Sequence, residues 1–429
     1  MKKKYRIILY TSIFLLCVVA SIILVVKKSN SVYEEESKPK VVKHKSMLSM
    51  NLEQTAGAGD YKTVTQSKWP TEGYKFNAEL SRCENGSTLS WDDTKKAVIV
   101  SGNLSDKCYV YFDIYQPTLA EYIKSQYTGT QGENNIYYHD SDLANGAGDN
   151  SYRYAGANPN NFVCFGTTES PCPTDNLYRI IGVFGENYHG VTGKQLVKLI
   201  KYDYMTTDEL GTDGDYSQTY KEWGMDSTYK GTYGDGERIG VYYWNYKATG
   251  SATNTWSTSL LNKTNLNTNF INNIGTTWAN KIATVTWKVG GNTWANIGTK
   301  TSSVAYTNEI TNPVTTNTTD NATTYSAKIG LMYVSDYGFA ASPDAWTLTM
   351  SSYNNTTATN NNWMYMGLYE WTISRYAGNS NNAFRVLRGG DVDIGYVGDD
   401  CGVRASFNLE SSVSYVSGSG SMSDPIVIN

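Results

Sequence analysis

Apolar residues follow two different patterns along this chain of 429 residues. Residues 5–26 form a nearly unbroken apolar run, which is long enough to cross the roughly 30 Å hydrocarbon core of a bilayer as one helix. From about residue 61 onward, short alternating runs are separated by clusters of Gly, Asn and Asp, as is typical of β-strands joined by turns. The pattern predicts one transmembrane helix followed by sheet-rich folded domains.

The apolar run is interpreted as an uncleaved signal anchor. A cleaved signal peptide has an apolar region of roughly 7 to 15 residues that ends at a small-x-small site, whereas Lys27 and Lys28 follow this run directly. Both flanks are basic, so flanking charge does not fix the orientation. The large polar remainder and its cysteines favour the outside. We expect a single-pass cell-membrane protein with a cytoplasmic tip at residues 1–4 and an extracellular C-terminal part.

Composition then marks a stalk and a small domain. Residues 27–60 are polar and charge-patterned, which predicts a solvated stalk. Residues 61–128 predict a small β module, in which Ala97–Val100 and Lys107–Phe112 have strand patterns. At the end of this module, apolar residues in 119–127 recur at helical spacing. We expect that short helix to pack on the module.

A second domain follows a predicted linker. Residues 129–150 are rich in Gly, Asn and Asp, which indicates a linker. Residues 151–429 contain further strand patterns, among them Leu177–Phe184 and Gln195–Lys201, together with a helical stripe of apolar positions. These elements predict an α+β domain.

The six cysteines predict two disulfides and a leftover thiol. Cys17 lies in the apolar run, so an odd number remains outside. We expect Cys83 to pair with Cys108, which would contribute about 3 kcal/mol to the small module, and Cys164 to pair with Cys172. Cys401 is then left over; a buried inert thiol is the preferred interpretation, with an interchain disulfide or a reactive thiol as alternatives.

The stretch 384–409 contains the most informative pattern. Two strand-like segments bracket a loop that carries acidic residues and one tyrosine, and such loops are how a rigid sheet presents a binding surface. The candidate ligand-binding residues of this loop are Asp391, Asp393, Tyr396, Asp399 and Asp400.

Composition narrows the choice of partner. Tyrosine is abundant, with 35 copies, and a surface rich in Tyr and Asn suits recognition; ordinary β-propensity explains the same count equally well. The net charge is -4, although residues 1–28 are basic, so the remainder is distinctly acidic. Nucleic-acid binding is set aside, because it depends on neutralising phosphates with Lys and Arg.

Catalytic motifs are not evident in the sequence. The three histidines show no zinc-ligand spacing, and no Ser-His-Asp arrangement or phosphate-binding glycine loop occurs in a suitable context. The acidic clusters can supply oxygen ligands to Ca²⁺, but each lacks the spacing of a calcium loop. We therefore expect no cofactor, with calcium kept as an alternative.

Two segments carry a resemblance to a known family. Arg385-Val-Leu-Arg-Gly-Gly390 followed by Gly402-Val-Arg404 resembles the closing strands of the formylglycine-generating-enzyme-like branch of the C-type-lectin fold. That family continues its Gly-Gly with Ser-Trp, where this chain has Asp391-Val392. A wider set of motifs, including Ser81–Trp91, Asp106–Phe112, Trp371–Arg375 and Val416–Ile428, resembles membrane-anchored surface proteins of Gram-positive gut bacteria, for which the resemblance supplies an architecture and no activity.

The resemblance implies a C-type-lectin-like domain in residues 151–429, preceded by the disulfide-tied β module and the transmembrane helix. The expected function is non-catalytic, adhesin-like binding of an extracellular glycan or protein. Trp371 and Arg375 are expected on the binding face with the acidic loop, whereas Arg388, Gly389, Gly390 and Arg404 are expected to brace it.

Three alternative functions remain at this point. A cysteine-dependent oxidase of the formylglycine-generating kind would use a cysteine pair to hold copper. A structural envelope protein would use the loop only for solubility. A binding protein diversified by a retroelement would share the Gly-Gly-loop-Gly-x-Arg ending on the same fold.

Overall fold

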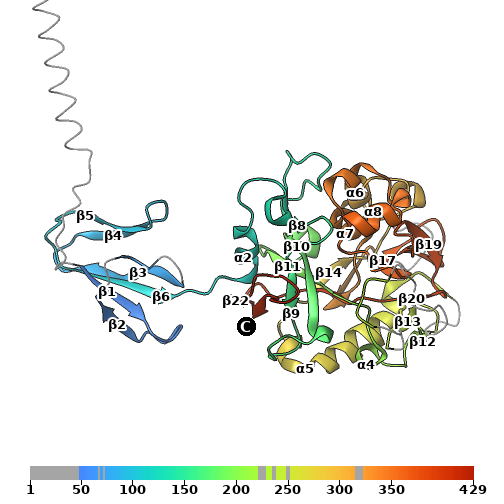
Figure 1. Ribbon diagram of the computed structural model, residues 1–429, viewed down its shortest axis with the longest axis horizontal. Helices are drawn as coiled ribbons and strands as arrows, with labels where there is room; N and C mark the ends of the chain where they lie inside the picture. Colours follow the sequence, from blue (N-terminus) through green and yellow to red (C-terminus); the bar gives the residue numbers. More distant parts are fainter. Residues whose placement is uncertain are drawn as a thin grey trace, which may run out of the picture. The chain divides into compact units, whose positions relative to one another are not determined.

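The computed structural model describes residues 48–65, 68–70, 73–220, 229–233, 238–247, 252–314 and 322–429 (Figure 1). The chain divides into two compact units, Met1–Tyr115 and Gln116–Asn429. The described residues are mostly β-sheet with some helices, so the predicted combination of sheet and helix is confirmed at that level.

The predicted membrane anchor lies outside the described residues, as do the predicted cytoplasmic tip and most of the stalk. Within the described residues, no helix is both long and apolar enough to cross a bilayer.

The first unit contains a sheet in the order β2-β1-β6-β3, and β4 pairs with β5. β6 runs antiparallel to β3 and parallel to β1. The strands are β1 (Leu48–Glu53), β2 (Tyr61–Val64), β3 (Tyr74–Cys83), β4 (Thr88–Asp92), β5 (Ala97–Ser101) and β6 (Cys108–Ile114).

The core of the first unit is small and centred on Phe112. This ring is almost fully buried and lies 5.8 Å from the ring of Trp69, 5.9 Å from Phe76 and 5.6 Å from Trp91. Cys83 and Cys108 are opposite each other where β3 ends and β6 begins, and they form the predicted disulfide. A covalent link at this point supplements a core too small to hold the sheet alone.

The predicted stalk boundary at residue 60 is wrong, because β1 belongs to the sheet of the first unit. Met50 and Leu52 are buried in its core. Apolar and polar residues alternate in β1 with the period of a strand, although the polar Asn51 and Glu53 are buried as well. The polar composition of the longer segment hid this short pattern.

The second unit contains two large sheets. The central sheet has the order β16-β21-β11-β10-β8-β7, and β9 pairs with β10. Its strands are β7 (Ile136–His139), β8 (Ser151–Tyr154), β9 (Phe162–Cys164), β10 (Leu177–Phe184), β11 (Leu196–Lys201), β16 (Ile329–Gly330) and β21 (Ser406–Asn408).

The other large sheet, called here the C-terminal sheet, has the order β12-β13-β20-β17-β18-β19. Two short pairs, β14 with β15 and β22 with β23, complete the strands of the described residues. The strands are β12 (Tyr216–Thr219), β13 (Gly240–Tyr243), β17 (Glu370–Arg375), β18 (Asn382–Val386), β19 (Val392–Tyr396), β20 (Asp400–Gly402), β14 (Val285–Lys288), β15 (Thr324–Ala327), β22 (Tyr415–Ser417) and β23 (Val427–Ile428).

Helices surround the sheets of the second unit. In Figure 1, α6, α7 and α8 lie together on one side of this unit, and α4 and α5 lie on the other. The helices are α2 (Leu119–Ser125), α3 (Glu186–His189), α4 (Thr207–Leu210), the π-helical η4 (Leu261–Phe270), α5 (Ile271–Ala279), α6 (Ser302–Tyr306), the π-helical η6 (Thr307–Thr311), α7 (Val334–Ala340) and α8 (Asn355–Asn361). The second unit also contains short 3₁₀ turns: η1 (Glu133–Asn135), η2 (Thr174–Asn176), η3 (Trp256–Thr258), η5 (Trp294–Asn296), η7 (Pro343–Thr347) and η8 (Met350–Ser352).

The predicted helix exists, but it belongs to the second unit. Thr118 caps the N-terminus of α2 with a capping box. Its hydroxyl accepts a hydrogen bond from the Glu121 N–H, and the Glu121 carboxylate accepts one from the Thr118 N–H. Leu119 and Ile123 are buried in the core of the second unit. The module therefore ends near Tyr115 rather than at residue 128.

The predicted linker at residues 129–150 is wrong, because it contains β7, which pairs along its whole length with β8. Ile136 and His139 of β7 are fully buried. Asn145 and Asn150 adopt positive φ, so the Asn-rich composition serves tight turns within the fold.

Cys164 and Cys172 form the second predicted disulfide, and Cys401 is the buried free cysteine of the described residues. The pairing predicted from the sequence is therefore confirmed.

The first disulfide gives a testable expectation. The Cys83→Ser/Cys108→Ser variant should lower the free energy of unfolding of the first unit by about 3 kcal/mol, because the unfolded chain loses a closed loop. Denaturant unfolding followed by tryptophan fluorescence measures the change. The matched control is Cys164→Ser/Cys172→Ser, which should leave the unfolding transition of the first unit unchanged. The expectation is contradicted if the Cys83→Ser/Cys108→Ser variant is as stable as the wild type.

Candidate functional site

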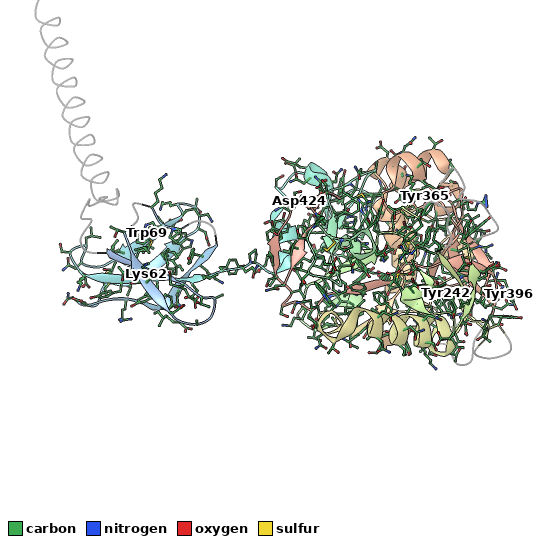
Figure 2. All side chains as sticks on the ribbon, turned by 60° about the horizontal axis from the view of Figure 1, so that its bottom comes forward. Lys62, Trp69, Tyr242, Tyr365, Tyr396 and Asp424 are labelled. Carbon is green, nitrogen blue, oxygen red and sulfur yellow. A yellow bond between two sulfur atoms is a disulfide. The ribbon has the colours of Figure 1, made fainter. Side chains whose placement is uncertain are left out.

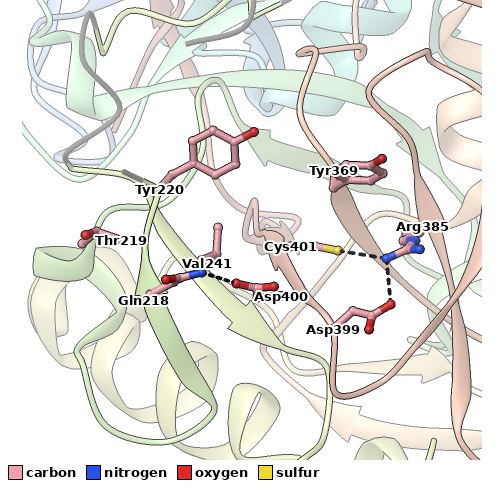
Figure 3. Close-up of a pocket in the computed structure, with 9 residues that line it drawn as sticks. All are labelled: Gln218, Thr219, Tyr220, Val241, Tyr369, Arg385, Asp399, Asp400 and Cys401. Atoms are coloured by element: carbon pink, nitrogen blue, oxygen red, sulfur yellow. Dashed lines mark hydrogen bonds and ion pairs between the residues drawn. The ribbon is translucent and has the colours of Figure 1, made fainter. Parts of the chain in front are cut away.

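A cavity of about 250 Å³ opens on the C-terminal sheet (Figure 3). Strands β12, β13, β18 and β20 contribute to its lining. The residues that line it are Gln218, Thr219, Tyr220, Val241, Tyr369, Arg385, Asp399, Asp400 and Cys401.

Strand register brings one wall of the cavity together. Gln218 lies opposite Val241 in the β12–β13 ladder, and Val241 lies opposite Gly402 in the β13–β20 ladder. Residues opposite one another in antiparallel strands share a face of the sheet. The polar end of Gln218 therefore meets Asp400, two residues before Gly402, and its Nε2 donates to Asp400 Oδ2 over 2.7 Å.

Arg385 forms the other wall. Its Nη1 donates to Asp399 Oδ2 over 3.0 Å and lies 4.0 Å from Cys401 Sγ. The guanidinium lies 5.3 Å from the ring centroid of Tyr369, within cation–π range. Burial works against its charge, but the neighbouring groups Cys401, Asp399 and Asp393 outweigh that cost and raise the pKa of Arg385. The guanidinium is thus held as a fixed positive charge.

Two tyrosine rings flank the cavity. Figure 3 shows Tyr220 and Tyr369 on two sides of it, with Cys401 and Asp400 toward the middle and Asp399 beside Arg385. A tyrosine combines an apolar ring face with a hydroxyl group, which is typical of recognition sites; the hydroxyl oxygen of Tyr220 is itself buried. The cavity therefore combines carboxylate, amide, guanidinium and aromatic groups.

Cys401 lines the cavity as a buried thiol. It is only 1% exposed, and burial raises its pKa to about 12. A thiol with that pKa is protonated at neutral pH, and nucleophilic attack and metal binding both need the thiolate. The other described cysteines form disulfides with one another. The residues around Cys401 therefore do not fit a copper-holding cysteine pair.

The acidic residues of the predicted loop lie at two separate places, the cavity and a second recess. Asp399 and Asp400 line the cavity, whereas Asp391 and Gly389 line a shallower recess with Ser351 to Asn354 and Thr356. Along the chain, the five-residue strand β19 lies between Asp391 and the pair Asp399 and Asp400. Burial, followed by the charge of Asp393, raises the pKa of Asp391.

The predicted loop is wrong over Val392–Tyr396, because these residues form β19 and pair with β18. Two of the candidate ligand-binding residues lie on this strand. Asp393 is opposite Arg385 in the β18–β19 ladder. Tyr396, at the end of β19, is 40% exposed and lies at the surface of the second unit (Figure 2).

Trp371 and Arg375 are buried, so the prediction that they lie on an exposed face is wrong. Both side chains are 0% exposed. Trp371 Nε1 donates to the Tyr242 carbonyl over 2.9 Å, and Arg375 Nη2 donates to the Val314 carbonyl over 2.6 Å. They belong to β17, which lies between β18 and β20 and is buried on both of its faces. Burial lowers the pKa of Arg375 to about 10.

The residues expected to brace the loop make contacts inside the fold. Arg404 is buried and pairs with both carboxylate oxygens of Glu370. Gly390 has φ of +93°, and a Cβ there would lie 2.3 Å from the Ala358 side chain, so a glycine is needed. The Arg388 guanidinium lies 5.9 Å from the ring centroid of Tyr369. These contacts favour a role in bracing the backbone around the acidic residues. Whether that bracing serves ligand binding stays a prediction.

Sequence reasoning missed Gln218, Tyr220, Tyr369 and Arg385. Arg385 lies in the motif that carries the resemblance, but the sequence gives no sign that it lines a cavity. Gln218 and Tyr220 are about 180 residues distant from the acidic loop, and only the β12–β13–β20 pairing brings them to it. No local pattern in the sequence signals such a long-range meeting.

No three His, Cys, Asp or Glu side chains among the described residues gather closely enough to hold a metal ion. Calcium binding stays an untested alternative.

Comparisons of the chain with models of known families, with curated proteins and with solved structures found no match. The resemblance to the C-type-lectin fold thus stays a prediction, and the cavity is the guide to function.

Cys401 gives a second testable expectation. In a Cys17→Ser background, the native full-length protein at about pH 8.5 should react very slowly with a thiol reagent, because Cys401 is buried and protonated. After unfolding, one thiol per chain should react. Spectroscopic thiol counting measures both states. Rapid labelling of the native protein, or a second thiol after unfolding, would show that the Cys401 environment or the disulfide pairing is wrong.

Proposed function

We propose that this protein is a membrane-anchored, extracellular, non-catalytic binding protein whose cavity on the C-terminal sheet binds a saccharide. The observation that carries the proposal is the lining of that cavity, in which two carboxylates, an amide and a guanidinium lie together with two tyrosine rings. A C-type-lectin-like fold for the second unit is part of the proposal, supported by the resemblance of the β18 and β20 segments.

The size of the cavity favours a small ring. Pockets for drug-sized ligands occupy roughly 300–1,000 Å³. A cavity of about 250 Å³ is suited to one sugar unit, with the rest of a larger ligand outside.

The polar groups suit hydroxyl groups. A sugar hydroxyl donates one hydrogen bond and accepts others, so it needs both kinds of partner. The carboxylates of Asp399 and Asp400 accept, and the guanidinium of Arg385 donates. Two carboxylates against one guanidinium give a lining with a net negative charge, which favours neutral sugars and amino sugars over acidic ones.

The cavity is also held in shape before a ligand arrives. Arg385 is fixed by Asp399, and Gln218 is fixed by Asp400. Fewer side-chain rotations are then lost on binding, which improves affinity.

The extracellular location is supported by the two disulfides, which persist in oxidising surroundings.

The Asp400→Ala variant tests the cavity. In the structure the Asp400 carboxylate accepts from Gln218 and lines the cavity, so its loss should weaken saccharide binding about tenfold or more, as expected for a hydrogen bond to a charged group. The measurement is binding of full-length protein in detergent to an array of neutral, amino and acidic saccharides, followed by calorimetric titration of the hits.

Asp391→Ala is the matched control, because Asp391 lines the separate recess. It should leave binding and the melting temperature unchanged. The proposal fails if the wild-type protein binds no saccharide, or if Asp400→Ala and Asp391→Ala have equal effects.

A copper assay separates the oxidase alternative from this proposal. The Cys401→Ser variant should hold no less copper than the wild type, because the Cys401 thiol is almost completely buried and is the free cysteine of the described residues. Stoichiometric copper in the wild type that is lost in Cys401→Ser would favour the oxidase instead.

A further inference from the structure

Three tyrosines form a group at the surface beside the cavity, called here the tyrosine platform: Tyr243, Tyr246 and Tyr396. Tyr246 is 42% exposed and Tyr396 is 40% exposed. The rings of Tyr243 and Tyr246 have centroids 5.0 Å apart. A Cβ on Gly398 would lie 2.5 Å from Tyr396 Cε1 and 2.9 Å from Tyr246 Cδ2, so both of these rings lie against the same bare backbone.

The platform is continuous with the cavity. Tyr243 lies opposite Asp400 in the β13–β20 ladder, so the two side chains share a face of the sheet. Val241, two residues earlier on the same strand, faces the same way and lines the cavity. Asp399, which also lines the cavity, directly follows Gly398. A ligand leaving the cavity on this side therefore meets the three rings.

The backbone that carries the rings is firmly held. Asp215 is fully buried, and its Oδ1 accepts from the N–H of Tyr246 over 3.2 Å and from that of Lys247 over 2.8 Å. On the other segment, the Val397 side chain is buried, and its carbonyl accepts from the Trp244 N–H over 3.0 Å. Exposed rings on a fixed backbone lose little freedom when a ligand covers them.

We propose that the tyrosine platform is a second subsite, so that the protein recognises an oligosaccharide whose next sugar rings stack on Tyr246 and Tyr396. This proposal rests on the saccharide site in the cavity. The apolar C–H face of a sugar covers an aromatic ring, while its hydroxyl groups stay in water or meet the tyrosine hydroxyls. Tyrosine suits such a contact because it supplies a large rigid surface at low entropic cost.

The test compares single sugars with chains on the full-length protein in detergent. Galactose, mannose and N-acetylglucosamine and a linear trisaccharide of each are titrated by calorimetry. The trisaccharide of the sugar that fits the cavity should bind about five- to tenfold more tightly than the single sugar, since aromatic contacts of this kind contribute modestly. The Tyr246→Ala/Tyr396→Ala variant should lose that gain and keep the affinity for the single sugar.

The Tyr246→Phe/Tyr396→Phe variant is the matched control, because it keeps the rings, and it should retain most of the gain. Asp400→Ala should weaken single sugar and trisaccharide alike. The platform proposal is overturned, with the cavity proposal intact, if the trisaccharide binds no more tightly than the single sugar or if the gain survives in the alanine pair. Failure of the wild type to bind any of the probes would overturn the cavity proposal, and the platform with it.

Discussion

The buried pair of Arg404 and Glu370 is the contact on which the arrangement of the second unit depends. Arg404 Nε donates to Glu370 Oε1 over 2.8 Å, its Nη2 donates to Oε2 over 2.9 Å, and Nη2 also donates to the Met364 carbonyl over 2.6 Å. Both side chains are almost inaccessible to water. Removing one partner would leave an uncompensated buried charge, which costs about 3–5 kcal/mol. The chain therefore cannot shift at this point without a large penalty.

The position of that pair matters because Arg404 lies between β20 and β21, where the chain passes from the C-terminal sheet to the central sheet. Glu370 begins β17, and its backbone is the register partner of Gly402 in β20. The pair thus fixes where β20 ends. With β20 fixed, Asp399 and Asp400 are held beside Gln218 and Arg385, and the cavity follows from the same constraint.

Local patterns in the sequence predicted local structure, and they failed where a distant strand decided the outcome. The disulfide between Cys83 and Cys108 followed from pairing the two cysteines of the small module, one of them in the recognisable strand pattern Lys107–Phe112. Asp399 and Asp400 followed from one recognisable loop. Trp371 and Arg375 alternate with polar residues, as in a half-exposed strand, yet both faces of β17 are covered by other parts of the fold. That covering comes from long-range packing, which no stretch of this chain encodes by itself.

The arginines of the C-terminal sheet show how structural and binding roles separate. Arg404 is buried, and its Nε and Nη2 donate three hydrogen bonds to Glu370 and Met364 inside the fold. Arg385, two strands away from β20, has one carboxylate partner, and its side chain is 19% exposed at the cavity. A guanidinium carries five N–H donors, so Arg385 keeps donors for a ligand while Asp399 balances its charge. The same residue type therefore stabilises the sheet at one position and leaves hydrogen-bonding capacity for recognition at the other.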